Sequence, residues 1–185
     1  MGCAISSALS MEALSSPRSD WWNVTVCGLP QCSRRVMVLW GLENEEEAMT
    51  ITGGCRCGAV RYTIDAERIT ARHCWCRDCQ YIGAGSGTVN VFFPSKAVKI
   101  EGALSDYTNH AASGNLMHRQ FCPKCGTPMF TQSDARLHMI GVRAGTLDDP
   151  ERGKPQMTIW TSSAPSWAIF DPNIQRDEKQ SPPPE

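Results

Sequence analysis

Two groups of closely spaced cysteines are the residues of this sequence best suited to chemistry. The stretch HCWCRDC, over residues 73–79, holds three cysteines at C-x-C-x2-C spacing, and GGCRCG and FCPKCGT each hold a pair. Neighbours this close cannot form disulfides across a fold, and clustered cysteines of an intracellular protein typically bind metal or react. Seven of the ten cysteines are therefore predicted to build metal sites: Cys55, Cys57, Cys74, Cys76, Cys79, Cys122 and Cys125.

The two cysteine pairs together offer four thiolates, which is the ligand set of a closed structural zinc site. Residues two apart in an extended segment face the same way, so Cys55 and Cys57 can bind one ion. In the second pair, Cys122 and Cys125, the intervening proline stiffens the turn and Gly126 permits a positive φ after the last ligand. The site would join segments far apart in the sequence, where a crosslink constrains the chain most.

The remaining group, Cys74, Cys76 and Cys79, offers three thiolates and leaves a fourth coordination position open. A zinc ion with three protein ligands and an exchangeable fourth position is typical of a reactive site. Such an ion lowers the pKa of a thiol or a water molecule that binds there. We therefore expect these three cysteines to hold a catalytic Zn²⁺, so that each chain binds two zinc ions.

The residues around the open group give further candidates. His73 could complete the ligand set, but an extended segment turns its side chain away from the neighbouring cysteine and to the side of Trp75. A role behind the ligands or in packing is the alternative, and His73 is kept as a candidate catalytic residue. Arg77, Asp78 and Arg119 are the charged residues nearest to the cysteines in sequence. They could bind a carboxylate of a substrate or lie in solvent.

Short strands must position these cysteines. From residue 51 onward, short apolar runs alternate with Gly, Pro, Asp and Asn. Short helical turns are expected near residues 77–81 and 147–151, and no long amphipathic helix is predicted. The pattern indicates a mainly β domain with few short helices, in which metal ions crosslink the chain. The expected strands cover residues 59–64, 88–93, 98–101, 104–108, 118–121, 129–131, 137–142 and 157–160.

One zinc-binding domain is expected over residues 49–173. Residues 1–48 read as an N-terminal extension, either flexible or upstream of a natural start at Met49, and residues 174–185 as a disordered, Pro-rich tail. The net charge of −1 offers no basic surface for nucleic acid. No apolar stretch reaches the roughly 18 residues of a transmembrane helix, and residues 1–16 lack the pattern of a signal peptide. We therefore expect a cytoplasmic protein without a membrane or nucleic-acid partner.

Five motifs taken together resemble a known family. GGCRCGAVRY, HCWCRDCQ, FCPKCGT, AGTLDDP and IWTSSAPSW, in this order over residues 51–171, are similar to those of the glutathione-dependent formaldehyde-activating enzymes, or S-(hydroxymethyl)glutathione synthase-like proteins. The resemblance implies an Mss4-like β-tent fold, a structural zinc on the four-cysteine set and a labile catalytic zinc on the three-cysteine set. It also implies carbon–sulfur lyase chemistry, in which the thiol of glutathione and formaldehyde, or a related small aldehyde, combine reversibly.

Other functions fit the same residues. A non-catalytic zinc module that carries a thiol or binds a protein would hold both metals without turnover. A zinc ribbon that binds nucleic acid is disfavoured by the near-neutral charge and the lack of a basic, aromatic stripe. A methionine sulfoxide reductase would need a reactive cysteine outside the two ligand sets, and the three remaining cysteines, Cys3, Cys27 and Cys32, all precede the expected domain.

Overall fold

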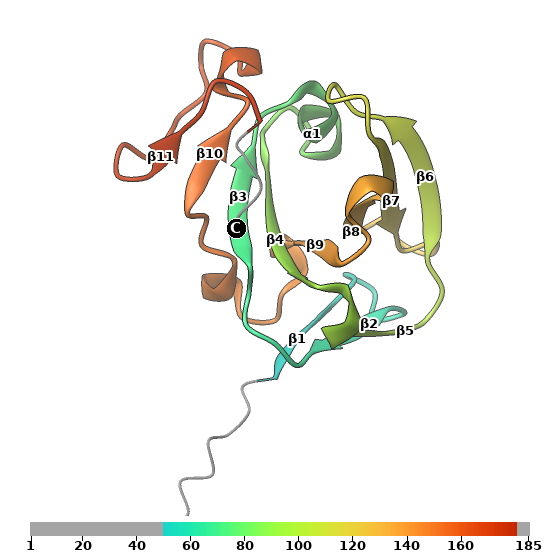
Figure 1. The fold of residues 1–185 in the computed structure, drawn as a ribbon. Coiled ribbons are helices and arrows are strands. Elements are labelled where there is room, and N and C mark those ends of the chain that lie inside the picture. The colour runs from blue at the N-terminus through green and yellow to red at the C-terminus, as the bar shows by residue number, and fades with distance from the viewer. Residues whose placement is uncertain (1–49, 181–185) are drawn as a thin grey trace, which may run out of the picture. The chain divides into compact units, whose positions relative to one another are not determined.

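A computed structural model describes residues 50–180, and these residues form a mainly β structure (Figure 1). The expected extension over residues 1–48 lies outside the described residues, as do Met49 and residues 181–185. One α-helix and a few 3-10 turns are the only helical elements within the described part, so the predicted fold class is confirmed. In this part of the chain, no helix has the length and apolar character needed to cross a membrane.

The strands form two sheets. β1, β2 and β5 make a small antiparallel sheet, and the others make an eight-stranded sheet in the order β11-β10-β3-β4-β9-β8-β7-β6. The strands are β1 (Ile51–Gly54), β2 (Arg61–Ile64), β3 (Thr70–Cys74), β4 (Thr88–Pro94), β5 (Val98–Glu101), β6 (Ser105–His110), β7 (Leu116–Phe121), β8 (Pro128–Ser133), β9 (Met139–Arg143), β10 (Met157–Ile159) and β11 (Gln175–Arg176). The helical elements are α1 (Arg77–Ile82), η1 (Ser95–Ala97), η2 (Asp134–Arg136), η3 (Ala144–Thr146), η4 (Pro150–Gly153) and η5 (Thr161–Ser163).

The central strands of the large sheet have one apolar face and one polar face, because successive side chains of a strand point to opposite sides. The apolar face packs into the hydrophobic core through a cross-strand row of fully or almost fully buried residues: Ala71, Val91, Val142 and Phe130. The adjoining positions form a second row on the other face, where Arg72, Asn90 and Arg143 stand opposite one another in β3, β4 and β9. This polar face carries the candidate site.

A buried hydrogen-bond chain connects the core to that site. Tyr62 of β2 packs edge-on against Phe130 of β8, with ring centroids 5.3 Å apart. The Tyr62 hydroxyl lies 2.9 Å from Oγ1 of Thr146, which itself donates to the backbone oxygen of Arg143 at 2.8 Å. Because the Thr146 proton is engaged, Tyr62 donates and Thr146 accepts. Burial raises the pKa of Tyr62 to about 12, so this hydroxyl keeps its proton.

Removing the Tyr62 hydroxyl is expected to lower stability without changing the fold. In a Tyr62→Phe variant, Thr146 loses a buried donor, and we expect the free energy of unfolding to fall by about 1–2 kcal/mol. Urea denaturation would measure the change. Tyr107→Phe is the matched control, because the Tyr107 side chain is 60% exposed. Equal midpoints for Tyr62→Phe and the wild type would show that the hydrogen bond contributes nothing.

Three strands, β1, β3 and β11, lie outside the predicted strands. The segment 174–180, expected to be disordered, is ordered: β11 pairs in parallel with β10, and the backbone N–H of Trp160 donates to the oxygen of Lys179 at 3.2 Å. Backbone pairing, rather than an apolar side-chain pattern, holds this segment in place. β3 lies outside every predicted strand, because its residues Arg72 and His73 break the apolar run that marks a strand. It is nevertheless paired on both sides, with β4 and β10.

Candidate metal centres and pocket

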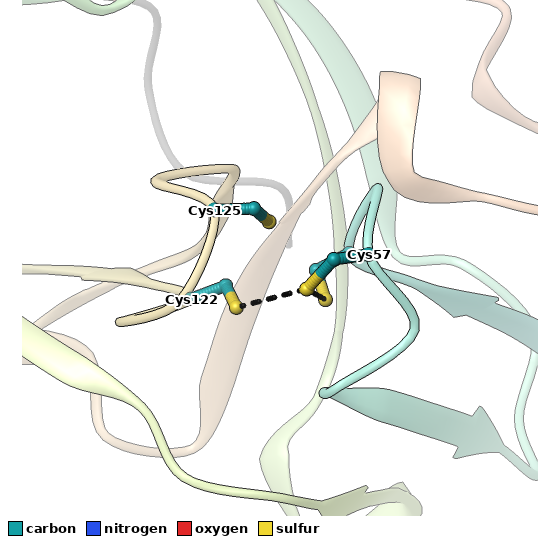
Figure 2. Close-up of side chains that lie close together, drawn as sticks. Cys57, Cys122 and Cys125 are labelled. Atoms are coloured by element: carbon teal, nitrogen blue, oxygen red, sulfur yellow. Dashed lines mark hydrogen bonds between the residues drawn. The ribbon is translucent and has the colours of Figure 1, made fainter.

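The first cysteine cluster joins the turn between β1 and β2 to the turn between β7 and β8. The Sγ atoms of its four members, Cys55, Cys57, Cys122 and Cys125, all lie within 4.8 Å of one another. Sγ of Cys57 lies 3.5 Å from that of Cys55 and 3.8 Å from that of Cys122, and Figure 2 shows the Cys57 and Cys122 sulfurs facing each other across the two turns. The predicted group of four is therefore brought together, in a geometry that suits one tetrahedral metal ion.

The two turns hold these sulfurs in a form ready for a metal. In the first turn, the backbone N–H of Val60 donates to Sγ of Cys55 at 3.2 Å. In the second, Gly126 has the predicted positive φ, 71°, and its N–H donates to the oxygen of Cys122 at 2.9 Å. Hydrogen bonds from the side chain and backbone of Thr127 lower the pKa of Cys125 to about 5. The thiolate, which is the metal-binding form, is thus favoured at this corner.

The second cluster lies where β3 ends and α1 begins. Cys74 is the last residue of β3, Cys76 is the N-cap of α1 and Cys79 lies in its first turn. The extended backbone of Cys76 and the helical turn that follows bring the three sulfurs within 4.8 Å of one another. Within residues 50–180, no ligand atom of a fourth His, Cys, Asp or Glu joins them. The predicted three-cysteine arrangement is therefore present.

The three thiols of this cluster shift one another's pKa values. Hydrogen bonds with Cys74 and then Cys76 lower the pKa of Cys79 to about 2, whereas hydrogen bonds with Cys76 and then Cys79, together with burial, raise the pKa of Cys74. Three thiolates this close, with Cys74 and Cys79 both buried, are compatible only with a cation that offsets their charge. A soft, tetrahedral divalent ion such as Zn²⁺ fits this donor set.

His73 lies on the other face of β3. Its ring packs against Trp75, with centroids 5.3 Å apart, and it is not part of the cysteine group. The direction predicted for its side chain is therefore confirmed. Burial lowers the pKa of His73, so the neutral ring is favoured. Trp75 itself is buried against Trp167 and Phe170 rather than lining the pocket. His73 thus supports the strand from behind, and its candidate role in catalysis stays a prediction.

A cavity of about 170 Å³ adjoins the three-cysteine cluster. Its lining includes all three cysteines and the polar row formed by Arg72, Asn90 and Arg143. Arg143 is buried beside Cys79, and its Nη1 donates to Oγ1 of Thr88 at 2.9 Å and to Oδ1 of Asn90 at 2.5 Å. A guanidinium held by neutral partners keeps its positive charge available to the thiolates and to a bound ligand.

Of the three charged residues singled out for their nearness to the cysteines in sequence, two line the cavity. Asp78 and Arg119 line it, and the Nη2 of Arg119 lies 2.7 Å from Oδ2 of Asp78. Arg77 is turned away and stacks on the exposed ring of Tyr81, 5.3 Å from its centroid.

Three further arginines of the lining were missed by the sequence analysis. They are Arg72, Arg136 and Arg143. Only Arg72 could have been found from the sequence. It lies two residues before Cys74, and residues two apart on a strand share a face. The other two arginines reach the cavity by strand pairing and by a turn that the sequence pattern does not predict.

A histidine of β7, His118, lies between two carboxylates of neighbouring elements. Nδ1 of His118 lies 2.5 Å from Oδ2 of Asp106 in β6, and its Nε2 lies 3.0 Å from Oδ1 of Asp134 in η2. Asp106 in the first place, and Asp134 to a smaller extent, raise the pKa of His118 above its usual 6.5. When it is protonated, the His118 imidazole links β6 and η2 to β7 through these two ion pairs.

This ion pair is expected to make stability depend on pH. Because the folded state binds the proton more tightly than the unfolded state, the contribution is fully present below about pH 6.5 and is lost as the pH rises through the pKa of folded His118. Urea denaturation from pH 6 to 9 should show a steeper loss in the wild type than in a His118→Gln variant. Asp106→Asn should lower the His118 pKa measured by NMR, and an unchanged value would contradict the assignment.

A family model and a curated relative both name one family. A family model described as "Glutathione-dependent formaldehyde-activating enzyme" matches residues 50–163, which contain both cysteine clusters. A protein of Halomonas elongata, named provisionally as a glutathione-dependent formaldehyde-activating enzyme, is 22% identical over 133 residues, or 69% of this chain and 85% of that protein. A crystal structure of a Rhodobacter sphaeroides protein is similar with a TM-score of 0.45 and 24% identity, over 56% of this chain and 96% of that one.

Proposed function

Because the chain belongs to the glutathione-dependent formaldehyde-activating enzyme family, we propose that its three-cysteine pocket catalyses the reversible addition of a thiol such as glutathione to formaldehyde or a related small aldehyde. In this reaction the sulfur forms a bond to the aldehyde carbon, and the proton of the thiol passes to the aldehyde oxygen. The reverse direction breaks the carbon–sulfur bond, so the protein would act as a carbon–sulfur lyase.

The observation that carries the proposal is a three-cysteine cluster that opens on a cavity. Cys74, Cys76 and Cys79 would hold one Zn²⁺, and the four-cysteine cluster would hold a second, structural one. A zinc ion with three thiolate ligands supplies a Lewis acid that lowers the pKa of a nearby thiol. The seven cysteines of residues 50–180 are all free of disulfides, which fits a reducing compartment such as the cytoplasm.

The chain itself contributes orientation and charge. Arg143, buried beside Cys79, places a fixed positive charge where the thiol sulfur and the aldehyde oxygen would react. α1 and the hairpin between β6 and β7 both contribute lining residues, so a substrate in the cavity would be partly removed from water. Charge on the reacting atoms is stabilised more strongly when water is excluded.

Turnover by the full chain tests the proposal. We expect the zinc-loaded protein to form the adduct of glutathione and formaldehyde well above the spontaneous rate, and to bind two zinc ions per chain. NMR exchange at equilibrium would follow both directions at once. If the protein binds two zinc ions and glutathione but leaves the rate unchanged, the catalytic proposal is wrong, and a non-catalytic zinc module that carries a thiol is the better description.

A further inference from the structure

The cavity beside the three cysteines is rich in arginine. Four arginines contribute to it, Arg72, Arg119, Arg136 and Arg143, and Asp78 is the one acidic residue among the described residues of the lining. That carboxylate is already engaged, because it accepts from Nη2 of Arg119 at 2.7 Å and from the side-chain amide of Asn109 at 3.3 Å. Of the other three arginines, Arg143 lies beside Cys79 and Arg72 is also engaged within the protein.

Arg136 is the arginine best placed to meet a ligand. It is half-buried at the end of η2, and within residues 50–180 no carboxylate lies within ion-pairing distance of its guanidinium. Arg72, in contrast, is 6% exposed. Both guanidiniums line the same cavity, where a bound anion would meet two positive charges.

The turn that carries Arg136 is held by hydrogen bonds and an ion pair of the residues before it. The Ser133 hydroxyl caps η2 by accepting from the N–H of Ala135 at 3.3 Å, and Asp134 pairs with His118. The amide of Gln132 donates to the backbone oxygens of Leu137 and Met139 at 3.1 and 3.3 Å. The guanidinium is therefore presented from a fixed turn, which is the arrangement that favours paired hydrogen bonds to a carboxylate.

We propose that Arg136, with Arg72 behind it, binds a carboxylate of the thiol substrate and makes the site select thiols that carry a carboxylate. The inference rests on the proposed function, since it assigns a specificity-determining residue to the same pocket. The cysteine cluster takes the sulfur end of the substrate and Arg136 takes an anionic end. A thiol without a carboxylate would still reach the cysteines but would lose this second attachment.

Binding of S-methylglutathione by the full, zinc-loaded chain tests the carboxylate subsite without requiring turnover. This probe keeps both carboxylates of glutathione but has no free thiol. We expect Arg136→Gln to weaken its binding by about tenfold in calorimetry, as loss of one charge-assisted contact would. Lys96→Gln, which removes an exposed positive charge outside the cavity, should leave binding unchanged. Zinc content and melting temperature would verify that both variants are folded.

The diethyl ester of S-methylglutathione completes the test. The wild type should bind the ester about as weakly as Arg136→Gln binds the free acid, and the variant should not distinguish the two probes. Unchanged binding of the acid by Arg136→Gln, or no binding of the acid by the wild type, would overturn the inference. Arg136-dependent binding in a protein without turnover would keep the subsite and reject the proposed catalysis, so the two failures are distinguishable.

Discussion

Replacing Cys76 with serine is expected to abolish turnover while leaving the protein folded. Cys76 is the half-buried member of the three-cysteine cluster, and serine is a favourable N-cap residue for the helix that begins there. The variant should hold one zinc ion per chain in place of two. We expect the rate above the spontaneous reaction to fall by a factor of about 10³ or more, which corresponds to about 4 kcal/mol of barrier.

Metal analysis, circular dichroism and adduct formation measured on the same sample would check this result. A Cys76→Ser variant that loses one zinc ion and keeps full activity would show that the three-cysteine cluster is not the reactive site. One that keeps both ions would show that Cys76 is not a ligand. The proposal stands only if metal and activity are lost together from a folded protein.

Replacing Cys122 with serine is expected to have the opposite effect, namely loss of the fold itself. Cys122 is fully buried and joins the turn after β7 to the turn after β1 through its cluster. Metal binding at such a site is coupled to folding, so removing a ligand removes stability directly. We expect a loss of about 4 kcal/mol or more, at the upper end of the range for single substitutions.

The two cysteine variants form a matched pair, because each changes one sulfur to oxygen in a different cluster. Thermal unfolding should place Cys122→Ser far below both the wild type and Cys76→Ser. A chelator strong enough to remove both ions should reproduce the Cys122→Ser result on the wild type. If Cys122→Ser has the same melting temperature as the wild type and keeps both zinc ions, the four-cysteine cluster is not a structural metal site.

The grouping of the cysteines could be read from spacing alone. C-x-C in an extended segment and C-x2-C in a turn are local geometries, so neighbouring sulfurs converge whatever the remaining fold. The side to which His73 points and the positive φ of Gly126 followed from equally local rules. The mainly β class followed from short apolar runs separated by turn residues, which are also local features.

The pocket could not be read in the same way, because its walls depend on pairing between distant strands. Arg72 and Arg143 share a face only because both stand opposite Asn90 of β4, and Arg136 reaches the same cavity from a turn after β8. β1, β3 and β11 were not predicted. The polar residues of β3 and β11 carry no apolar alternation, and pairing with β10 orders both strands. Local spacing thus determined which atoms can bind metal, whereas long-range strand register decided which charges surround them.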